Sequence, residues 1–334
     1  MPDALLPALA GFVVALGVTR IVERASRRRG LLDEPNDRSS HVLPTPRIGG
    51  IGVVAGVTCG WLLAAGWRDP AWAALVAGAG ALALVGLADD LGRSSLIGKY
   101  LAQVISAAMV TIAYAPSLAL RFGNASLEVD GALATVLVVI WLTAIVNAFN
   151  FIDGIDGMLG SIVVVAGVVG SVLVGPSVDA NLVVVAAAAL GFLAWNHAPA
   201  SIFMGDVGSQ FLGLWVGASL LRTPDGVVEI VPILLLFGLL LLDTGSTLLS
   251  RAIQGKNLFS AHREHLYQRL VAAGASQRAI SALYAAITAA LGAAAVAWGR
   301  LEASEQIALM LATVVGGGLM LAFVRRAERR SSAG

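Results

Sequence analysis

The 334-residue chain has little charge and almost no cysteine. Only 13% of its residues are Asp, Glu, Lys or Arg, against roughly a quarter in soluble globular domains. The single cysteine, Cys59, excludes a disulfide framework or a Cys-based metal site within one chain. Acidic and basic residues nearly balance, with a net charge of +1, and we expect no nucleic-acid partner.

The chain is correspondingly rich in hydrophobic residues. They make up 57% of the chain, and the mean hydropathy is +0.83. Since a bilayer requires roughly 20 apolar residues per helix, this length holds about ten to twelve spans and no sizeable soluble domain. We predict an all-α, polytopic membrane helix bundle of about 11 transmembrane helices, in one integral-membrane domain over residues 1–334. The expected spans are 4–22 (a retained helix), 49–66, 71–88, 99–115, 131–149, 158–174, 181–197, 208–221, 230–250, 279–298 and 304–324.

Arginine is concentrated in the first polar loop, after residue 22. The positive-inside rule places such a loop in the cytoplasm, and alternation of the spans then assigns the other loops. The segments expected on the same side are 89–98, 150–157, 198–207, 251–278 and 325–334. These segments are rich in charge or in Gly, Asp and His, so we expect the polar motifs to share the cytoplasmic face.

One of these motifs, N-A-F-N-F-I-D-G-I-D-G, directly follows a very apolar run. It brings Asn147, Asn150, Asp153 and Asp156 to the edge of the bilayer. Polar groups are expensive there, which favours a functional site. Amide and carboxylate oxygens also suit Mg²⁺ that shares its ligands with substrate phosphates. The alternative is a solvated helix end that is merely acidic and Gly-rich.

An acidic pair, Asp89 and Asp90, ends another expected span and is followed by Lys99. Carboxylates this close raise the pKa of one of them and attract a cation, so they suit metal binding or proton transfer. The alternative is a pair of solvated acids at a helix end.

Two further loops carry candidate residues. Asp206 lies between glycines in F-M-G-D-V-G-S, ten residues after Asn196, a pattern that suggests a metal or phosphate site. The longest late loop holds His262, Arg263 and His265, and its Arg offers a fork of donors that matches phosphate oxygens. A basic cytoplasmic loop can equally be a topology signal alone.

Two charged residues stand nearer the apolar segments. Arg47, in P-T-P-R-I-G-G, precedes a helix start whose backbone N–H groups attract phosphate. Asp243 lies inside an apolar run and is either a site residue or the partner of a basic group such as Arg251.

Together, P-T-P-R-I-G-G, G-L-A-D-D…K, N-A-F-N-F-I-D-G-I-D-G, F-M-G-D-V-G-S and H-R-E-H-L-Y-Q-R resemble the polyprenyl-phosphate N-acetylhexosamine-1-phosphate transferases of glycosyltransferase family 4. The resemblance covers about residues 33–269. It implies transfer of a sugar 1-phosphate from a UDP-N-acetylamino sugar to polyprenyl (undecaprenyl) phosphate, with Mg²⁺ or Mn²⁺, at the cytoplasmic face of a bacterial inner membrane. Phosphoryl transfer of this kind depends on positioning and charge neutralisation.

The resemblance also implies roles for individual residues. The metal ligands are Asp206 and Asn150. The catalytic candidates are Asp89, Asp90, Lys99, Asp153 and His265, with the acidic pair and Lys99 receiving the lipid phosphate. The substrate-binding candidates are Arg47, Asn147, Asp156, Asn196, Phe203, His262 and Arg263, of which Asp156, Asn196 and Phe203 are similar to uridine-pocket residues. The member of the Asp89–Asp90 pair that acts as base stays open, as does the oligomeric state, a homodimer included.

The late loop departs from the denser histidine cluster that many members carry. It looks more like the branch that starts O-antigen or capsule-type glycans, with UDP-linked N-acetylfucosamine, N-acetylquinovosamine or N-acetylglucosamine as donor. The rival function is an ion-coupled transporter, but transporters place polar groups near the bilayer midplane and often carry internal repeats. CDP-alcohol phosphatidyltransferases continue their acidic D-G motif with Ala-Arg, which this chain lacks.

Overall fold

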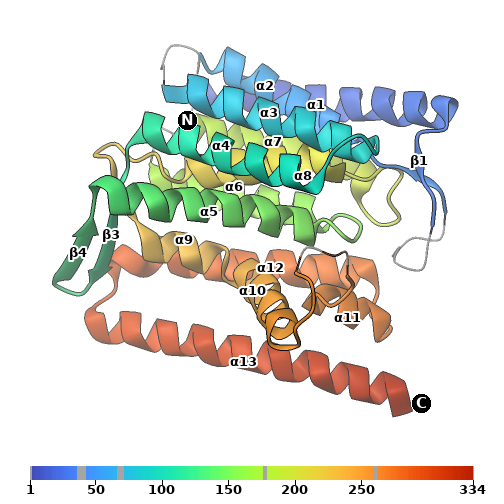
Figure 1. Ribbon diagram of the computed structural model, residues 1–334. Coiled ribbons are helices and arrows are strands. Elements are labelled where there is room, and N and C mark those ends of the chain that lie inside the picture. Colours follow the sequence, from blue (N-terminus) through green and yellow to red (C-terminus); the bar gives the residue numbers. More distant parts are fainter. Residues whose placement is uncertain are drawn as a thin grey trace.

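The computed structural model describes residues 2–35, 43–65, 71–175, 179–258, 260 and 262–333. Helices dominate these residues (Figure 1). They are α1 (Pro2–Arg29), α2 (Gly50–Leu63), α3 (Ala71–Asp90), α4 (Leu96–Tyr114), α5 (Gly131–Ile152), α6 (Met158–Val174), α7 (Asp179–Asn196), α8 (Gly205–Ser219), α9 (Ile230–Leu236), α10 (Gly238–Ile253), α11 (Leu266–Ala272), α12 (Gln277–Ala297) and α13 (Ala303–Ala333).

Each predicted span coincides with helix, which confirms the polytopic membrane class. Among the described residues, six helices are long and apolar enough to cross a bilayer: α1, α3, α4, α5, α12 and α13. The predicted span 230–250 is instead two helices, α9 and α10, bent by 76° at Phe237, and counting them as one span gives seven. The other four predicted segments are the shorter helices α2, α6, α7 and α8, of 14, 17, 18 and 15 residues.

Short strands, which the all-α expectation did not include, lie outside the helices. β1 (Leu32–Asp33) pairs with β2 (Thr45–Pro46), and β3 (Ser117–Phe122) pairs with both β4 (Ala125–Val129) and β5 (Val227–Glu229). Backbone N–H and C=O groups outside a helix still require partners, and these ladders supply some of them.

Helix α8 forms the centre of the bundle. Every residue from Val207 to Ser219 is buried, and the helix packs against α3 and α5. At the other extreme, α13 lies at the edge of the bundle with a mostly exposed apolar surface, as a helix facing lipid would (Figure 1). The two ion-paired contacts between Arg269 and Glu328, both 2.6 Å, connect it to α11.

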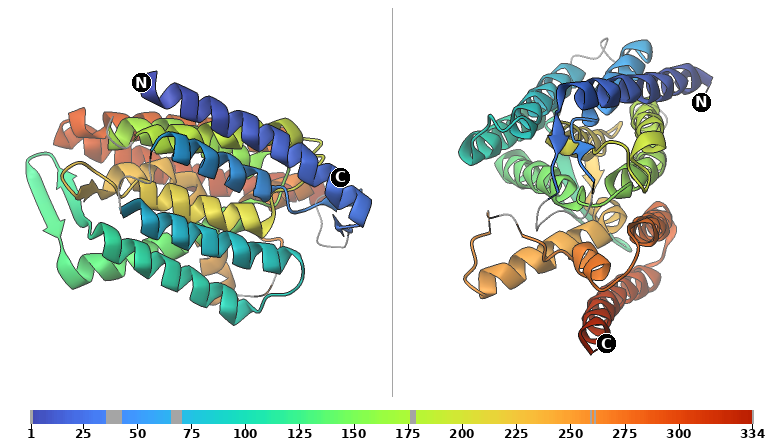
Figure 2. Two further views of the ribbon diagram at one scale, coloured as in Figure 1. Left: turned by 90° about the horizontal axis from the view of Figure 1, so that it is seen from above. Right: turned by 90° about the vertical axis from the view of Figure 1, so that its right-hand side faces the viewer.

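The motif-bearing loops gather at one end of the molecule. β1, the α3–α4 turn, α11 and the C-terminus lie at this end, and β3, β4 and the N-terminus lie at the other (Figures 1 and 2). Local signals fix the turn: Gly92 takes a φ of +68°, and Ser95 Oγ accepts the Gly98 N–H at 3.1 Å to begin α4. The end of α3 and the start of α4 are thereby held together beside α8.

Candidate active site

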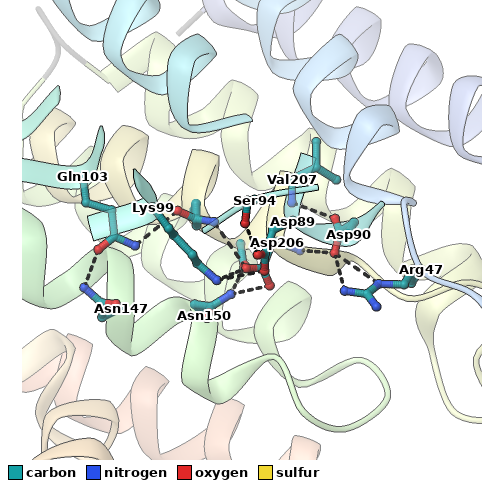
Figure 3. A network of polar contacts seen from close by, with 12 residues as sticks. Arg47, Asp89, Asp90, Ser94, Lys99, Gln103, Asn147, Asn150, Asp206 and Val207 are labelled. Carbon is teal, nitrogen blue, oxygen red and sulfur yellow. Dashed lines mark hydrogen bonds and ion pairs between the residues drawn. The ribbon is translucent and has the colours of Figure 1, made fainter. Parts of the chain in front are cut away.

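Three acidic and basic side chains meet where α3, α4 and α8 converge (Figure 3). Lys99 donates to Asp206 and, at 3.2 Å, to Asp89. Ser94 donates to the other oxygen of Asp89. Two carboxylates from different helices therefore converge on one cation, at the end of the bundle that also carries the arginine-rich loop.

Asn150, at the end of α5, completes this group. Its amide N–H₂ donates to Asp206 Oδ1 at 2.7 Å and to Ser209 Oγ at 3.0 Å. Those bonds orient the amide, and its Oδ1 has no hydrogen bond to any described residue. Asn150 also lines a cavity with a volume of about 340 Å³.

The oxygen groups of Asp206 and Asn150 fit a magnesium ion. Mg²⁺ takes oxygen ligands and is commonly held by one or two carboxylates together with substrate phosphates. The described residues contain no cluster of three or more His, Cys, Asp or Glu side chains placed to hold a metal. A dedicated protein cage is therefore absent from that part of the chain, and a bound cation would draw its remaining ligands from phosphate and water.

Asp90 differs sharply from its neighbour Asp89. Its side chain is 1% exposed, against 34% for Asp89. Its carboxylate pairs with Arg47 at 3.1 Å and accepts the backbone N–H groups of Asp206 and Val207, each at 3.1 Å. Asp90 thus caps the start of α8, where an anion is also favoured by the helix dipole.

This close fit depends on glycine. A Cβ on Gly86 would lie 2.4 Å from the Asp206 carbonyl oxygen, and one on Gly205 would lie 2.1 Å from the Arg47 carbonyl oxygen. Gly205 also has a φ of +72°, a conformation that other residues rarely adopt. These glycines let α3, α8 and the Arg47 segment approach closely enough to assemble the charged groups.

Asp153 lies at the C-terminal end of α5, near the same charges. Burial raises the pKa of its carboxyl well above the ordinary value, and the negative charges of Asp206 and Asp90 raise it further. Four carboxyls (Asp89, Asp90, Asp153 and Asp206) thus lie near two cations (Lys99 and Arg47), and the raised pKa of Asp153 favours its neutral form. A bound divalent cation would favour the ionised form of these carboxyls.

A chain of side-chain amides links Asn147 to Asp206. Asn147 donates to Gln103 at 2.8 Å, Gln103 donates to Gln210 at 3.2 Å, and Gln210 donates to Asp206 at 3.3 Å. Both glutamines are fully buried, and the sequence analysis missed them. Their signal was available: each is a polar residue inside a predicted span (99–115 and 208–221), where polar groups mark functional or packed interior sites.

The late loop forms the opposite wall of the cavity. His262 and His265 line it together with Lys99, Asn147 and Asn150. The two imidazole rings stack, with centroids 5.0 Å apart. Burial lowers the pKa of His262 to about 4, and repulsion from His265 and Arg251 adds to this.

From the sequence, Asp243 was either a site residue or the partner of a basic group such as Arg251, and the structure distinguishes these alternatives. Asp243 bonds to His265, with 3.1 Å between Oδ1 and Nδ1. Arg251 pairs instead with Glu264 at 2.6 Å, in the same loop. Asp243 therefore belongs to the environment of the cavity wall.

The four remaining candidates lie outside the described lining of this cavity. Asn196 is buried and bonds to backbone groups of Gly157 and Ile202, each at 3.0 Å. Asp156 accepts the Ala200 N–H at 2.8 Å. Both side chains brace loops beside the cavity.

Phe203 and Arg263 also belong to the surroundings. The Phe203 backbone pairs with Pro46 at 2.8 Å and with Gly49 at 2.9 Å, which docks the Arg47 segment. Arg263 is exposed on the loop before α11. The structure thus brings Lys99, Asn147, Asn150, His262 and His265 to one cavity and leaves these two outside its described lining.

Comparison with known proteins identifies the family. Residues 72–223 match the model described as Glycosyl transferase family 4. A relative named "Probable undecaprenyl-phosphate N-acetylglucosaminyl 1-phosphate transferase", from Bacillus subtilis (strain 168), is 32% identical over 286 residues, covering 81% of this chain and 78% of the relative. The chain belongs to glycosyl transferase family 4.

Other members of family 4 are similar over comparable lengths. "Decaprenyl-phosphate N-acetylglucosaminephosphotransferase" from Mycolicibacterium smegmatis is 32% identical over 313 residues, covering 82% of this chain and 76% of the relative. "Undecaprenyl-phosphate alpha-N-acetylglucosaminyl 1-phosphate transferase" from Escherichia coli (strain K12) is 29% identical over 288 residues, covering 80% and 77%. The family assigned from the motifs is confirmed.

Proposed function

We propose that this protein transfers N-acetylglucosamine 1-phosphate from UDP-N-acetylglucosamine to a polyprenyl phosphate such as undecaprenyl phosphate, releasing UMP. The observation that carries the proposal is the convergence of Asp206, Asn150, Lys99 and Asp89 beside a cavity of about 340 Å³. The names of the relatives in family 4 support N-acetylglucosamine among the sugars considered from the sequence.

In the proposed reaction, an oxygen of the lipid phosphate forms a bond to the β-phosphorus of the UDP-sugar. The bond from that phosphorus to the bridging oxygen breaks, and UMP leaves with it. Positioning and charge neutralisation are the main requirements of such a transfer. Lys99 supplies positive charge between the two reacting phosphates, and Asp89 orients that ammonium from the exposed side of the site.

Asp206 and Asn150 would hold a magnesium ion, or manganese in its place. When bound, that ion neutralises phosphate charge as the transfer proceeds. Gln210 holds the Asp206 carboxylate from one side and Asn150 from the other, at 3.3 and 2.7 Å. Asp90 and Arg47 keep the start of α8 in place, and the buried Asp153 carboxyl would become ionised more readily with the ion bound nearby.

The remaining candidates would hold the donor. His262, His265 and Asn147 line the cavity, while Asp156, Asn196 and Phe203 brace the adjoining loops, and Arg263 extends the basic surface. Leu96 lines the same cavity and is 52% exposed on the side of α4. A lipid phosphate could therefore arrive from the hydrocarbon while the nucleotide arrives from water.

The membrane arrangement is part of the proposal. We infer one integral-membrane domain over residues 1–334 in which α2, α6, α7 and α8 also cross, giving eleven spans with α9 and α10 as one. The motif-bearing end would face the cytoplasm of a bacterial inner membrane, since the arginine-rich loops lie there.

The direct test incubates purified protein with undecaprenyl phosphate, Mg²⁺ and a panel of UDP-N-acetylamino sugars, and detects the lipid product by mass. We expect a polyprenyl diphosphate N-acetylglucosamine and an equal amount of UMP. EDTA should abolish both products. No lipid product with any sugar, from folded protein supplied with metal, would contradict the proposal and favour the transporter alternative.

Isotope exchange tests the single displacement. Because one phosphoanhydride replaces another, the reaction should run backwards, and labelled UMP should enter the UDP-sugar when lipid phosphate is present. We expect no exchange when the lipid is omitted. Exchange without lipid would indicate a covalent phospho-sugar enzyme with an aspartate as nucleophile.

A further inference from the structure

Asp243 is a fully buried carboxylate in α10, one and a half turns after the bend at Phe237. It accepts hydrogen bonds from the Leu266 N–H at 2.8 Å, the Tyr267 N–H at 3.3 Å and the Tyr284 hydroxyl at 2.6 Å. The ring Nδ1 of His265 lies 3.1 Å from its Oδ1. Three elements, α11, α12 and the loop before α11, thus converge on one carboxylate.

This arrangement determines which ring nitrogen of His265 carries the proton. An ionised carboxylate only accepts hydrogen bonds, so the nitrogen that faces it must be an N–H donor. Nδ1 faces Asp243, and the neutral ring is therefore left with its lone pair on Nε2. A hydrogen bond at one ring nitrogen setting the role of the other is a general property of histidine.

Nε2 is left without a partner in the part of the chain that the structure describes. His265 is 2% exposed, and Nε2 is a buried atom with no hydrogen bond. The ring lies in the cavity wall beside Phe151 and His262, with ring centroids 5.5 Å and 5.0 Å away. Leaving a buried polar atom unpaired is unfavourable, so a bound ligand that pairs it gains binding energy.

The backbone of His265 is fixed as well. Its N–H donates to Gln268 at 3.2 Å, and the preceding Glu264 pairs with Arg251 at 2.6 Å. The ring can therefore change neither its place nor its tautomer without breaking several contacts. That rigidity is what a positioned binding group requires.

We propose that Asp243 is a positioning residue that holds the His265 proton on Nδ1, so that Nε2 accepts a hydrogen bond from a hydroxyl or acetamido N–H of the bound N-acetylamino sugar. The identity of the ligand rests on the proposed function, whereas the tautomer does not. A neutral Nε2 lone pair repels a phosphate oxygen and attracts a donor group, so Asp243 would direct the sugar and not the diphosphate to this wall.

Nitrogen-15 NMR of the histidine side chains tests the tautomer directly. The chain has only four histidines, and the His265 signals can be assigned by their loss in His265→Gln. In solubilised protein, at a pH where the ring is neutral, we expect a protonated Nδ1 and an unprotonated Nε2. A protonated Nε2 in the wild-type protein would overturn the proposal, whether or not any variant folds and whether or not transfer activity is found.

Asp243→Asn tests the role of the carboxylate. The amide keeps the size of the side chain but cannot accept from all four donors. We expect the His265 proton to move to Nε2 and kcat/KM for the UDP-sugar to fall by on the order of 10²-fold, the scale of a misplaced binding group. Unchanged turnover despite the altered tautomer, or an unchanged tautomer in this variant, would each overturn the proposal.

Tyr284→Phe is the matched control. It removes one of the four donors to Asp243 and leaves the His265 contact in place. We expect the wild-type tautomer and kcat/KM within a few-fold of wild type, with some loss of thermal stability. If Tyr284→Phe lowered kcat/KM as much as Asp243→Asn, Asp243 would act only through packing of α12, and the proposal would fail.

A double-mutant cycle completes the test. If Asp243 acts through His265, adding Asp243→Asn to His265→Gln should lower kcat/KM little further, because His265→Gln has already removed the imidazole that Asp243 positions. Fully additive losses would show that Asp243 acts independently of the imidazole. The cycle requires transfer activity. If the wild-type protein formed no product, that result would count against the proposed function, while the NMR measurement would still test the tautomer.

Discussion

At the scale of single residues, Asp89 and Asp90 show how neighbouring carboxylates acquire different tasks. Helical geometry turns them about 100° apart around α3. Asp90 is directed into the bundle, where Arg47 and two backbone N–H groups satisfy it, and Asp89 faces the exposed side with Lys99 and Ser94. A carboxylate whose lone pairs are already committed is poorly placed to act as a base, which favours Asp89.

This difference predicts that two isosteric variants affect different quantities, stability in one and turnover in the other. Asp90→Asn should lower the free energy of unfolding by about 1–3 kcal/mol, because it breaks a buried charged hydrogen-bond network. Asp89→Asn should retain the wild-type melting temperature and lower kcat strongly. Thermal unfolding and transfer assays on both variants check this. Equal stability losses in the two would contradict the separation of roles.

A second prediction concerns the metal. A ligand that binds only the folded state raises stability, by about 2.7 kcal/mol at a hundred times its dissociation constant. Mg²⁺ should therefore raise the melting temperature of the wild-type protein. Asp206→Asn should remove that rise and lower kcat by 10²-fold or more. Sodium at matched ionic strength is the control, and an equal rise in the variant would place the ion elsewhere.

His262 predicts a pH dependence of stability. Its pKa is about 4 in the fold, below the ordinary value of 6.5. As the pH falls below 6.5, the unfolded chain binds a proton that the folded loop takes up only near 4, so stability should fall through that interval and be unaffected above it. His262→Gln should lose less stability between pH 7 and 4.5 than the wild type, measured as melting temperature. Parallel curves would refute the shift.

At the scale of helices, the site depends on the contact between α3 and α8. Gly86→Ala would place a methyl group 2.4 Å from the Asp206 carbonyl oxygen, which must push the two helices apart. We expect on the order of a 10²-fold loss of kcat from the displaced Asp206. Gly80→Ala, on the same helix with nothing within 4 Å of its Cβ, should keep wild-type activity. Similar losses in both variants would indicate a general effect on α3.

The positions of the helices were predictable because apolar runs are long and their ends are marked by polar motifs. The bend at Phe237 was not predicted, because Gly238, the one local sign of it, lies in a run long enough to be read as a single span and does not by itself specify a bend of this size. Asp243 was noticed as an intramembrane carboxylate, but its partner proved to be His265 and not Arg251. Contacts between segments far apart in the chain depend on packing, which a single sequence does not specify.

For the site as well, the sequence indicated the individual residues but not all of the contacts between distant segments. Asp206, Asn150, Lys99 and Asp89 were each named from local motifs, and the structure places them in contact. Gln103 and Gln210 were overlooked because neither belongs to one of the five motifs, although each lies four residues after a motif residue, Lys99 or Asp206, in the same helix. The assignment of catalytic, binding and metal roles stays a prediction for the variants above.

At the scale of the whole molecule, two independent patterns coincide at one end. One is the gathering of the polar motifs beside the cavity, and the other is the concentration of arginine at the end of α1 and at the end of α13. The first puts the proposed site at one end of the helices, where lipid and water would meet. The second, by the positive-inside rule, predicts that this end is cytoplasmic, where nucleotide sugars are made.

Cysteine labelling tests that orientation. In a Cys59→Ala background, which removes the chain's single cysteine, Arg93→Cys and Ser331→Cys introduce exposed thiols at the motif-bearing end, and Ser126→Cys introduces one in β4 at the other. A reagent that cannot cross membranes should label Ser126→Cys in intact cells with a permeabilised outer membrane. It should label the other two only after the inner membrane is opened. The reverse pattern would place the site outside the cell, away from cytoplasmic UDP-sugar, and would contradict the proposed donor together with the orientation.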